Sequence, residues 1–159
     1  MGSESSSVTT STTSARRVVL LGATGAVGRN VLAEALRSPA FETVTTLGRR
    51  HAEVADGEAP AGKLAQHVVD LEDPASYRAL VSGHTAAICT LGVGQPSKST
   101  RQEVQRVEID YVLGFAAACK DAGVGHFSLM TSVGAFRLVV YRDKLSDDPL
   151  PQGWEQGCG

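Results

Sequence analysis

Apolar and polar residues alternate in two different patterns between residues 16 and 135. Short runs of apolar and β-branched residues predict strands at 18–21, 43–47, 64–69, 86–91 and 126–131. Segments with apolar residues three and four positions apart predict helices at 26–38, 74–81 and 100–121. A loop rich in Gly, Ala, Pro and acidic residues lies at 51–62. Strands and helices therefore follow one another along the chain.

Residues at the helix ends agree with these boundaries. Pro74 suits a first helical turn, Thr100 and Glu103 have the spacing of a capping box, and Gly123 stands just past the longest helix. Buried strands that alternate with helices predict an α/β fold with right-handed crossovers. We expect a Rossmann-like parallel sheet of about five strands with helices on both faces.

The 159 residues are enough for one domain, which we place at 16–135. Residues 1–15 are rich in Ser and Thr and have no apolar periodicity, so we expect them to be disordered. Residues 136–159 are mostly polar, contain Pro and Gly, and are expected to form a poorly ordered tail. The C-terminal half of the fold would then be incomplete, as in a truncated product. A homo-oligomer or a protein partner would cover the exposed sheet edge.

The N-terminal segment leaves the location of the protein open between three alternatives. It has no apolar region typical of a secretory signal, and we expect a cytoplasmic protein. A Ser-rich start followed by Arg16 and Arg17 is also compatible with a mitochondrial transit peptide. Met1 and Gly2 followed by Ser6 match the myristoylation pattern, which would associate the chain with a membrane.

Composition excludes several classes of function. A formal net charge of −2, with 20% charged residues, gives no reason to expect a nucleic-acid partner. No apolar run approaches the roughly 20 residues of a membrane span. Cys89, Cys119 and Cys158 are odd in number and widely spaced, so they predict neither a metal site nor a disulfide framework.

The strongest motif is a glycine at every third position between the first strand and the first helix. We expect Gly22 to permit a tight turn, Gly25 to admit a pyrophosphate close to the backbone, and Gly28 to let the helix pack on the sheet. The first helical N–H groups would then face the phosphates. Because strand, loop and helix stand in the required order, the motif predicts a dinucleotide site rather than a structural turn.

The end of the second strand indicates which dinucleotide is bound. NAD-preferring sites place Asp or Glu there, whereas this chain has Arg49 and Arg50, which suit a 2′-phosphate. The sequence therefore predicts NADP(H). Asp70, after the third strand, is a candidate acceptor from the adenine amine, although an ordinary strand-end Asp explains it nearly as well. Leu91 and Gly92, after the fourth strand, are expected beside the ribose and nicotinamide.

The chain resembles the atypical short-chain dehydrogenases of the Tat-interacting-protein-like oxidoreductase group. The resemblance covers roughly residues 17–135 and rests on the segments 21–25, 46–50, 68–70, 89–92, 107–113 and 126–135. It implies NADPH-dependent reduction of a small carbonyl substrate. It also implies cofactor contacts from Thr24, Gly25, Ala26, Val27, Arg49, Arg50, Leu91 and Gly92.

The resemblance implies a catalytic Ser, Tyr and Lys, and here the sequence departs from the pattern. Ser132 matches the first position, but Tyr141 and Lys144 are three residues apart instead of four. The Lys of the family lowers the pKa of the Tyr, so that the phenol can exchange a proton with the substrate oxygen. Three hypotheses follow: an active oxidoreductase, a non-catalytic NADP(H)-binding regulatory or interaction protein, and a truncated product without activity.

Overall fold

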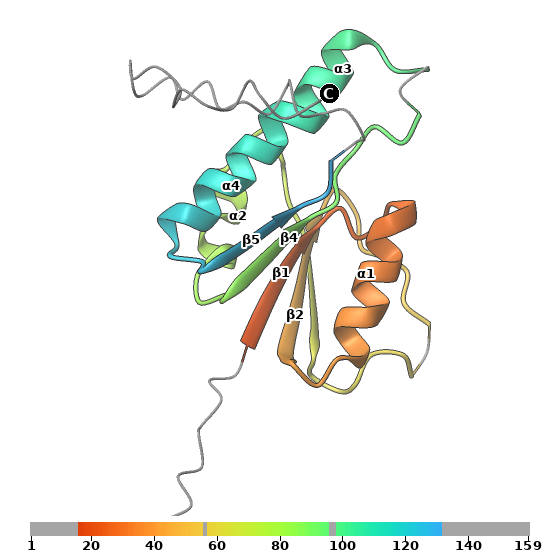
Figure 1. Ribbon diagram of the computed structural model, residues 1–159, viewed down its shortest axis with the longest axis vertical. Coiled ribbons are helices and arrows are strands. Elements are labelled where there is room, and N and C mark those ends of the chain that lie inside the picture. Colours follow the sequence, from red (N-terminus) through yellow and green to blue (C-terminus); the bar gives the residue numbers. More distant parts are fainter. Residues whose placement is uncertain (1–15, 56, 96–97, 132–159) are drawn as a thin grey trace, which may run out of the picture.

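A computed structural model describes residues 16–131 of the chain except 56, 96 and 97. Five parallel strands form one sheet in the order β3-β2-β1-β4-β5 (Figure 1). The strands are β1 (Arg16–Leu21), β2 (Phe41–Gly48), β3 (Leu64–Val68), β4 (Ala86–Cys89) and β5 (His126–Leu129). The helices are α1 (Ala26–Arg37), α2 (Ala75–Val81), α3 (Arg101–Gln105) and α4 (Tyr111–Asp121), with the π-helical segment η2 (Arg106–Asp110) joining α3 to α4. The predicted α/β fold with helices on both faces is confirmed.

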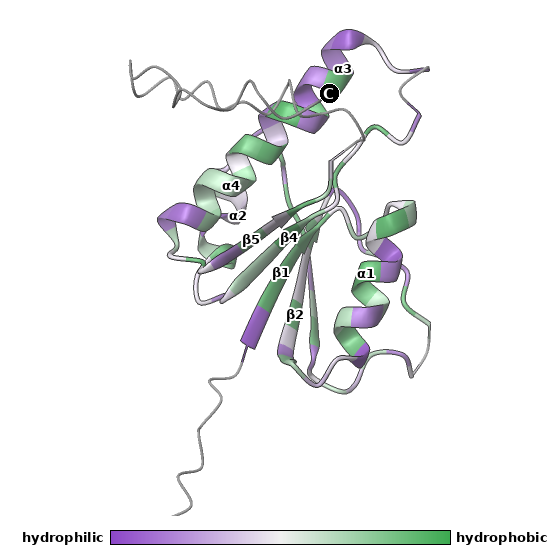
Figure 2. Ribbon diagram, in the orientation of Figure 1, coloured by the Kyte–Doolittle hydropathy of each residue, from purple (hydrophilic) through white to green (hydrophobic). Residues whose placement is uncertain are grey.

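The central strand β1 separates two hydrophobic cores. Val18 and Leu20 pack on the side of α1, whereas Val19 and Leu21 pack on the side of α2 and α4. All four are at most 1% exposed, as expected for a strand with a helix layer on each face. Figure 2 shows hydrophobic residues concentrated on the central strands and on the helices beside them. The apolar runs of the sequence therefore mark strands that are buried on both faces.

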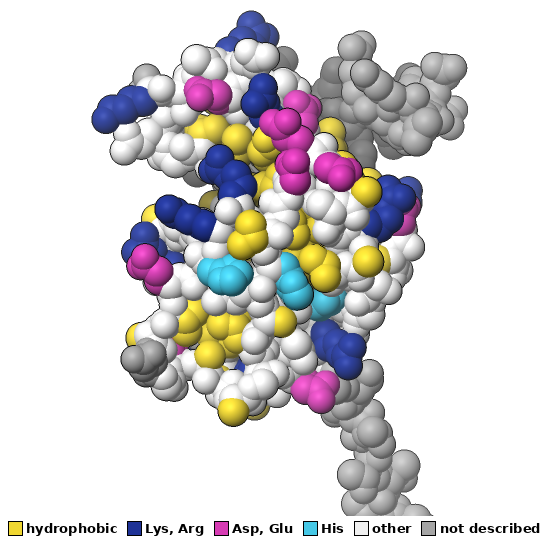
Figure 3. Space-filling view, turned by 180° about the vertical axis from the view of Figure 1, so that it is seen from behind, with side chains coloured by type: hydrophobic (Ala, Val, Ile, Leu, Met, Phe, Trp, Pro, Cys, Tyr) yellow, Lys and Arg dark blue, Asp and Glu magenta, His cyan; other side chains and the backbone are white. Residues whose placement is uncertain are grey.

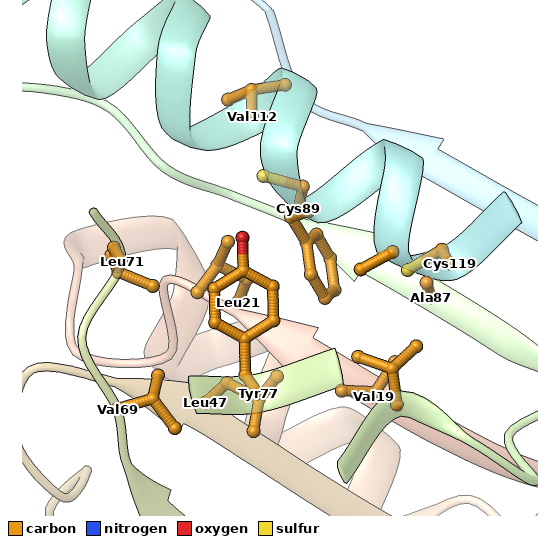
Figure 4. Close-up of a cluster of buried hydrophobic side chains, with 13 residues drawn as sticks. Val19, Leu21, Leu47, Val69, Leu71, Tyr77, Ala87, Cys89, Val112 and Cys119 are labelled. Atoms are coloured by element: carbon orange, nitrogen blue, oxygen red, sulfur yellow. The ribbon is translucent and has the colours of Figure 1, made fainter. Parts of the chain in front are cut away.

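An aromatic cluster fills the larger core, between the sheet and α4. The ring of Phe115 lies 6.5 Å from that of Tyr77 in an edge-on arrangement and 5.7 Å from that of Phe127. These residues come from α4, α2 and β5, so the cluster joins α2 to two elements that come much later in the sequence. Cys89 and Cys119 are buried in the same core as thiols (Figure 4).

The predicted ends of the longest helix are confirmed. The Thr100 hydroxyl accepts from the Glu103 N–H at 3.1 Å, and the Glu103 carboxylate accepts from the Thr100 N–H at 2.7 Å. The hydrogen bonds that the Glu103 carboxylate accepts from the Thr100 N–H and from the Thr100 hydroxyl lower the pKa of Glu103. At the other end, Gly123 has a φ of +73°, and the N–H groups of Gly123 and Val124 bond back to the last turn in a Schellman motif.

The structure corrects one predicted helix and the ends of two predicted strands. The helix expected at 100–121 is not one uniform α-helix, because five of its residues form η2. A π-helical turn widens the backbone without changing the apolar character of the residues, so the sequence pattern does not reveal it. Strands predicted to reach 91 and 131 end at Cys89 and Leu129, and Thr90 and Met130 each add one more backbone hydrogen bond to the neighbouring strand.

The surface of the described residues carries charges of both signs. Figure 3 shows basic and acidic side chains interspersed over the upper part of one face. Some form exposed ion pairs, as between Arg78 and Asp121 at 3.9 Å. Within the described ranges, no helix has both the length and the apolar character to cross a bilayer. Residues 1–15 and 136–159, predicted to be disordered and poorly ordered, lie outside the described part.

Candidate functional site

The order of the strands reverses between β1 and β4, and a cavity of about 370 Å³ lies at the carboxyl ends of the strands there. This is the position where open parallel sheets bind ligands, because the loops on either side of the reversal diverge. The cavity is lined by Gly22, Ala23, Thr24, Gly25, Thr46, Leu47, Gly48, Arg49, Arg50, Leu71, Thr90, Leu91, Gly92, Val107 and Tyr111.

Gly22 and Gly28 are required by the packing of the loop itself. Gly22 has a φ of +96°, and a Cβ there would lie 2.8 Å from the Thr90 backbone and hydroxyl. A Cβ on Gly28 would overlap the carbonyl oxygen of Gly22. Both positions therefore need glycine for the fold, with or without a ligand.

Gly25 is different, because nothing in the fold excludes a side chain from it. Its φ of −78° suits any residue, and a Cβ would meet only the Gly22 carbonyl oxygen, at 3.4 Å. The side chain of another residue would extend over the exposed mouth of the loop, where the predicted pyrophosphate approaches the backbone. The structure thus offers a cradle that a Cβ would partly fill, which fits a bound phosphate group.

The N-terminus of α1 opens onto this cradle. Gly25 is its N-cap and offers no side-chain acceptor, and the first turn holds no acidic residue. The amides of the first turn have no acceptor within the helix, and the helix dipole makes this end partly positive. Ala26, Val27 and Gly28 supply these amides, so the helix start suits an anionic group.

Thr90 fixes the loop from the neighbouring strand, a contact that sequence reasoning missed. Its buried hydroxyl lies 3.3 Å from the carbonyl oxygen of Leu21 and 3.2 Å from that of Gly22. One hydroxyl therefore holds β4 and the glycine loop together at the point where the strand order reverses.

Arg49 and Arg50 lie on a turn that β3 holds in place. The Gln66 side chain accepts from the Ala52 N–H at 2.8 Å and donates to the Ala52 carbonyl oxygen at 3.3 Å. The Val69 N–H also donates to the Gly48 carbonyl oxygen at 2.9 Å. Both arginine side chains are exposed, and among the described residues neither forms an ion pair. Both guanidinium groups are therefore available to a ligand.

A second wall of the cavity comes from Leu71, Val107 and Tyr111, none of which the sequence singled out as binding residues. The phenol of Tyr111 donates to the Glu72 carboxylate at 3.1 Å, and Arg106 lies 3.3 Å from the same oxygen. Partial burial of the phenol, together with this carboxylate, raises the pKa of Tyr111. Tyr111 therefore lines the cavity as a neutral, half-buried side chain, and its hydrogen bond to Glu72 connects α4 to the loop after β3.

The structure brings together most of the residues predicted to bind the cofactor. Seven of them line the cavity: Gly22, Thr24, Gly25, Arg49, Arg50, Leu91 and Gly92. The start of α1 supplies three more, Ala26, Val27 and Gly28. Asp70 is exposed and is not part of the lining, and its carboxylate accepts from the Glu72 N–H at 2.9 Å. Its predicted contact with adenine stays a prediction.

The three predicted catalytic residues, Ser132, Tyr141 and Lys144, lie outside the described residues. Their mutual geometry is therefore not part of this site. The described cavity combines the N-terminus of α1 with two exposed arginines after β2, an arrangement whose charge suits an anionic ligand.

This combination of fold and glycine loop defines a class of nucleotide-binding Rossmann domains, and comparison with family models gives the same class. Residues 22–151 match the family described as NAD(P)H-binding. The chain belongs to this NAD(P)H-binding family.

Two curated relatives support this membership. Protein HTATIP2 of Rattus norvegicus is 36% identical over 120 residues, which cover 76% of this chain and 48% of the relative. The mitochondrial protein fmp52 of Aspergillus fumigatus is 33% identical over 148 residues, covering 87% of this chain and 62% of the relative. The chain thus spans about half to three-fifths of the length of these relatives. The resemblance inferred from the sequence segments is confirmed.

Solved structures share the fold at lower identity. A mutant uronate dehydrogenase from Agrobacterium tumefaciens, complexed with NAD, has a TM-score of 0.59 at 21% identity, covering 74% of this chain and 41% of that one. The protein MoeE5, in complex with UDP-glucose and NAD, also has a TM-score of 0.59, at 22% identity, covering 73% and 36%. At this identity the likeness establishes the Rossmann-like fold alone.

Proposed function

We propose that this chain binds NADP(H) and is an NADPH-dependent oxidoreductase of the short-chain dehydrogenase/reductase class that acts on a small carbonyl substrate. One observation carries the cofactor proposal. Of the described residues that line the cavity at the strand reversal, two are arginines and none is Asp or Glu. A bound nicotinamide would supply hydride chemistry, whereas the residues of the chain bind and orient the cofactor.

Preference for NADP(H) over NAD(H) follows from the charge at the end of β2. A ribose 2′-hydroxyl is recognised by a carboxylate acceptor, and a 2′-phosphate by guanidinium donors. Arg49 and Arg50 follow β2 directly, and Gln66 holds the turn that carries them. One or two charge-assisted hydrogen bonds to the extra phosphate support an affinity for NADPH at least about tenfold above that for NADH.

Calorimetric titration of the chain with NADPH and NADH tests this proposal. Replacing both residues, Arg49→Ala with Arg50→Ala, is expected to reduce the affinity for NADPH to about that for NADH and to leave NADH binding unchanged. Arg16→Ala is the matched control, because Arg16 begins β1 at the opposite end of the sheet and is also exposed. Equal dissociation constants for the two cofactors in the unmodified chain would refute the preference.

A second candidate function is that of a non-catalytic NADP(H)-binding regulatory or interaction protein. The spacing of Tyr141 and Lys144, three residues instead of four, favours it over an active enzyme. Both candidates share the same cofactor site, so only a turnover assay separates them. A protein with this function would respond to NADP(H) by a change in stability or association rather than by chemistry.

Partners and location belong to this proposal as well. We propose a cytoplasmic protein, with the mitochondrial alternative supported by the name of the fmp52 relatives. In the described ranges, β5 pairs with β4 on one side only, which supports a second copy or a protein partner along its other edge. Light scattering coupled to gel filtration distinguishes a monomer from a dimer, and fractionation of cells decides the location.

A further inference from the structure

The loop that follows β4 is held by a carboxylate of the π-helical segment. The Glu108 carboxylate accepts a hydrogen bond from the Val93 N–H at 3.3 Å. The same oxygen lies 3.6 Å from the point where a Cβ of Gly92 would stand. Glu108 is half-buried, so this carboxylate lies against the backbone of Gly92 and Val93 and not free in solvent.

The π-helical backbone decides where this carboxylate lies. Val107, within η2, and Tyr111, directly after it, both line the cavity. Glu108 lies between them in the sequence, within η2. Each residue of a π-helical turn is rotated relative to its place in an α-helix, and such turns are frequent at functional sites. Here two consecutive residues of the turn contact different parts of the site. Val107 lines the cavity, and Glu108 contacts the loop after β4.

The two halves of the cavity lie on opposite sides of β1. Arg49 and Arg50 follow β2 on one side, and Leu91 and Gly92 follow β4 on the other. In the proposed binding mode the arginines hold the adenosine 2′-phosphate, so the loop after β4 contacts the other half of the dinucleotide. A residue that fixes this loop therefore acts on one end of the ligand only.

We propose that Glu108 is a positioning residue that holds Gly92 and Val93 against the nicotinamide-side half of a bound dinucleotide. This inference rests on the proposed NADP(H) site. Glu108 need not touch the ligand, because its carboxylate bonds to the backbone N–H of Val93. An amide oxygen accepts the same hydrogen bond, so Gln at this position keeps the loop in place, whereas Ala releases it.

The test compares a whole cofactor with one half of it. The intact chain and the variants Glu108→Ala and Glu108→Gln are titrated with NADPH and with adenosine 2′,5′-bisphosphate. Glu108→Ala is expected to weaken the binding of NADPH about three- to tenfold, the scale of the net contribution of one hydrogen bond, and to leave the binding of the bisphosphate unchanged. Glu108→Gln is expected to bind both as the unmodified chain does.

Glu42→Ala is the matched control, since Glu42 is an exposed acid near the amino end of β2, away from the cavity. If Glu108→Ala binds NADPH with normal affinity, or if it loses affinity for NADPH and for the bisphosphate equally, the positioning role is overturned. If the unmodified chain binds neither ligand, the proposed function itself has failed, which is a separate outcome. Thermal unfolding of each variant shows that a lost affinity comes from the site and not from a lost fold.

Discussion

At the scale of single residues, the three glycines of the loop after β1 have different reasons to be glycine. Gly22 and Gly28 leave no room for a Cβ, whereas Gly25 has room and an ordinary backbone conformation. A motif that appears uniform in the sequence therefore combines two packing requirements with one position, the N-cap Gly25, at which the described fold has room for a side chain. This distinction makes the proposed cofactor site separable from the fold by mutation.

Gly25→Val is expected to leave the chain folded and to abolish NADPH binding, because the branched side chain would occupy the phosphate cradle. Gly28→Ala is the contrasting variant and is expected to destabilise the fold by more than about 2 kcal/mol, through overlap with the Gly22 carbonyl group. Thermal unfolding and cofactor titration of both variants check the pair. Normal NADPH binding by a folded Gly25→Val protein would show that the loop is only a turn.

The buried thiol of Cys119 gives a prediction about pH. Burial, with a smaller contribution from Cys89, raises the pKa of Cys119 from its ordinary value of 9.0 to about 12. A group whose pKa is raised on folding stabilises the folded state below its unfolded pKa, and this contribution is lost as pH rises toward the folded value. The free energy of unfolding is therefore expected to fall between about pH 9 and 12.

Urea unfolding at a series of alkaline pH values measures this fall. Burial also raises the pKa of Cys89 and Tyr77, so Cys119→Ala is expected to make the decline shallower without removing it. For each protein, the free energy of unfolding at alkaline pH is compared with its own value at neutral pH. This comparison separates the effect of ionisation from the effect of the cavity that Cys119→Ala leaves. An identical decline in both proteins would contradict the assignment to Cys119.

At the scale of elements, the approach of α4 to α2 depends on a small residue facing a polar group. The hydroxyl of Tyr77 is buried and has no hydrogen-bond partner among the described residues. It points toward α4 (Figure 4), and a Cβ added to Gly114 would lie 3.0 Å from it. Gly114 therefore makes room for a hydroxyl group that itself costs free energy to bury.

Tyr77→Phe is expected to stabilise the chain by about 1 kcal/mol, since it removes a buried unpaired hydroxyl and keeps the ring contact with Phe115. Gly114→Ala alone is expected to raise the free energy of unfolding only slightly, because the new methyl group crowds the Tyr77 hydroxyl. In the Tyr77→Phe protein, Gly114→Ala is expected to raise the free energy of unfolding by as much as about 1 kcal/mol, because Ala has the higher helix propensity. Denaturant unfolding of the four proteins measures this coupling, and strictly additive effects would argue against the contact.

At the scale of the whole molecule, the sheet order brings the loops that we propose to bind the cofactor together at one edge, although they come from distant parts of the chain. The reversal between β1 and β4 opens the cavity, and the glycine loop, the arginine turn and the loop after β4 all reach it. This arrangement is complete within the described residues. Binding of NADP(H) and reduction of a substrate are therefore separable questions for this chain.

We predict that the chain binds NADPH but reduces carbonyl substrates at least about a hundredfold more slowly than an enzyme with a positioned proton donor. The reason is the spacing of Tyr141 and Lys144, which departs from the pattern that lowers the pKa of the phenol. NADPH oxidation is followed by absorbance with a panel of aldehydes, ketones and quinones. Tyr141→Phe is measured in parallel. Rapid turnover that disappears in Tyr141→Phe would restore the active-enzyme hypothesis.

The sequence by itself determined the order of strands and helices, because apolar periodicity and turn residues are local properties of the chain. It also determined the glycine loop and the pair Arg49 and Arg50, whose meaning depends on their distance from the preceding strand. These signals were enough to predict the fold, the cofactor class and seven of the fifteen residues that line the cavity.

Only the tertiary structure decided which distant residues support that site. Thr90 bonds to Gly22 across 68 positions of sequence, and Gln66 holds the turn after Arg50 from another strand. The π-helical turn that directs Glu108 toward Val93 leaves the apolar pattern of its helix intact. Such contacts depend on the register between packed elements, which long-range packing fixes and which no local pattern contains.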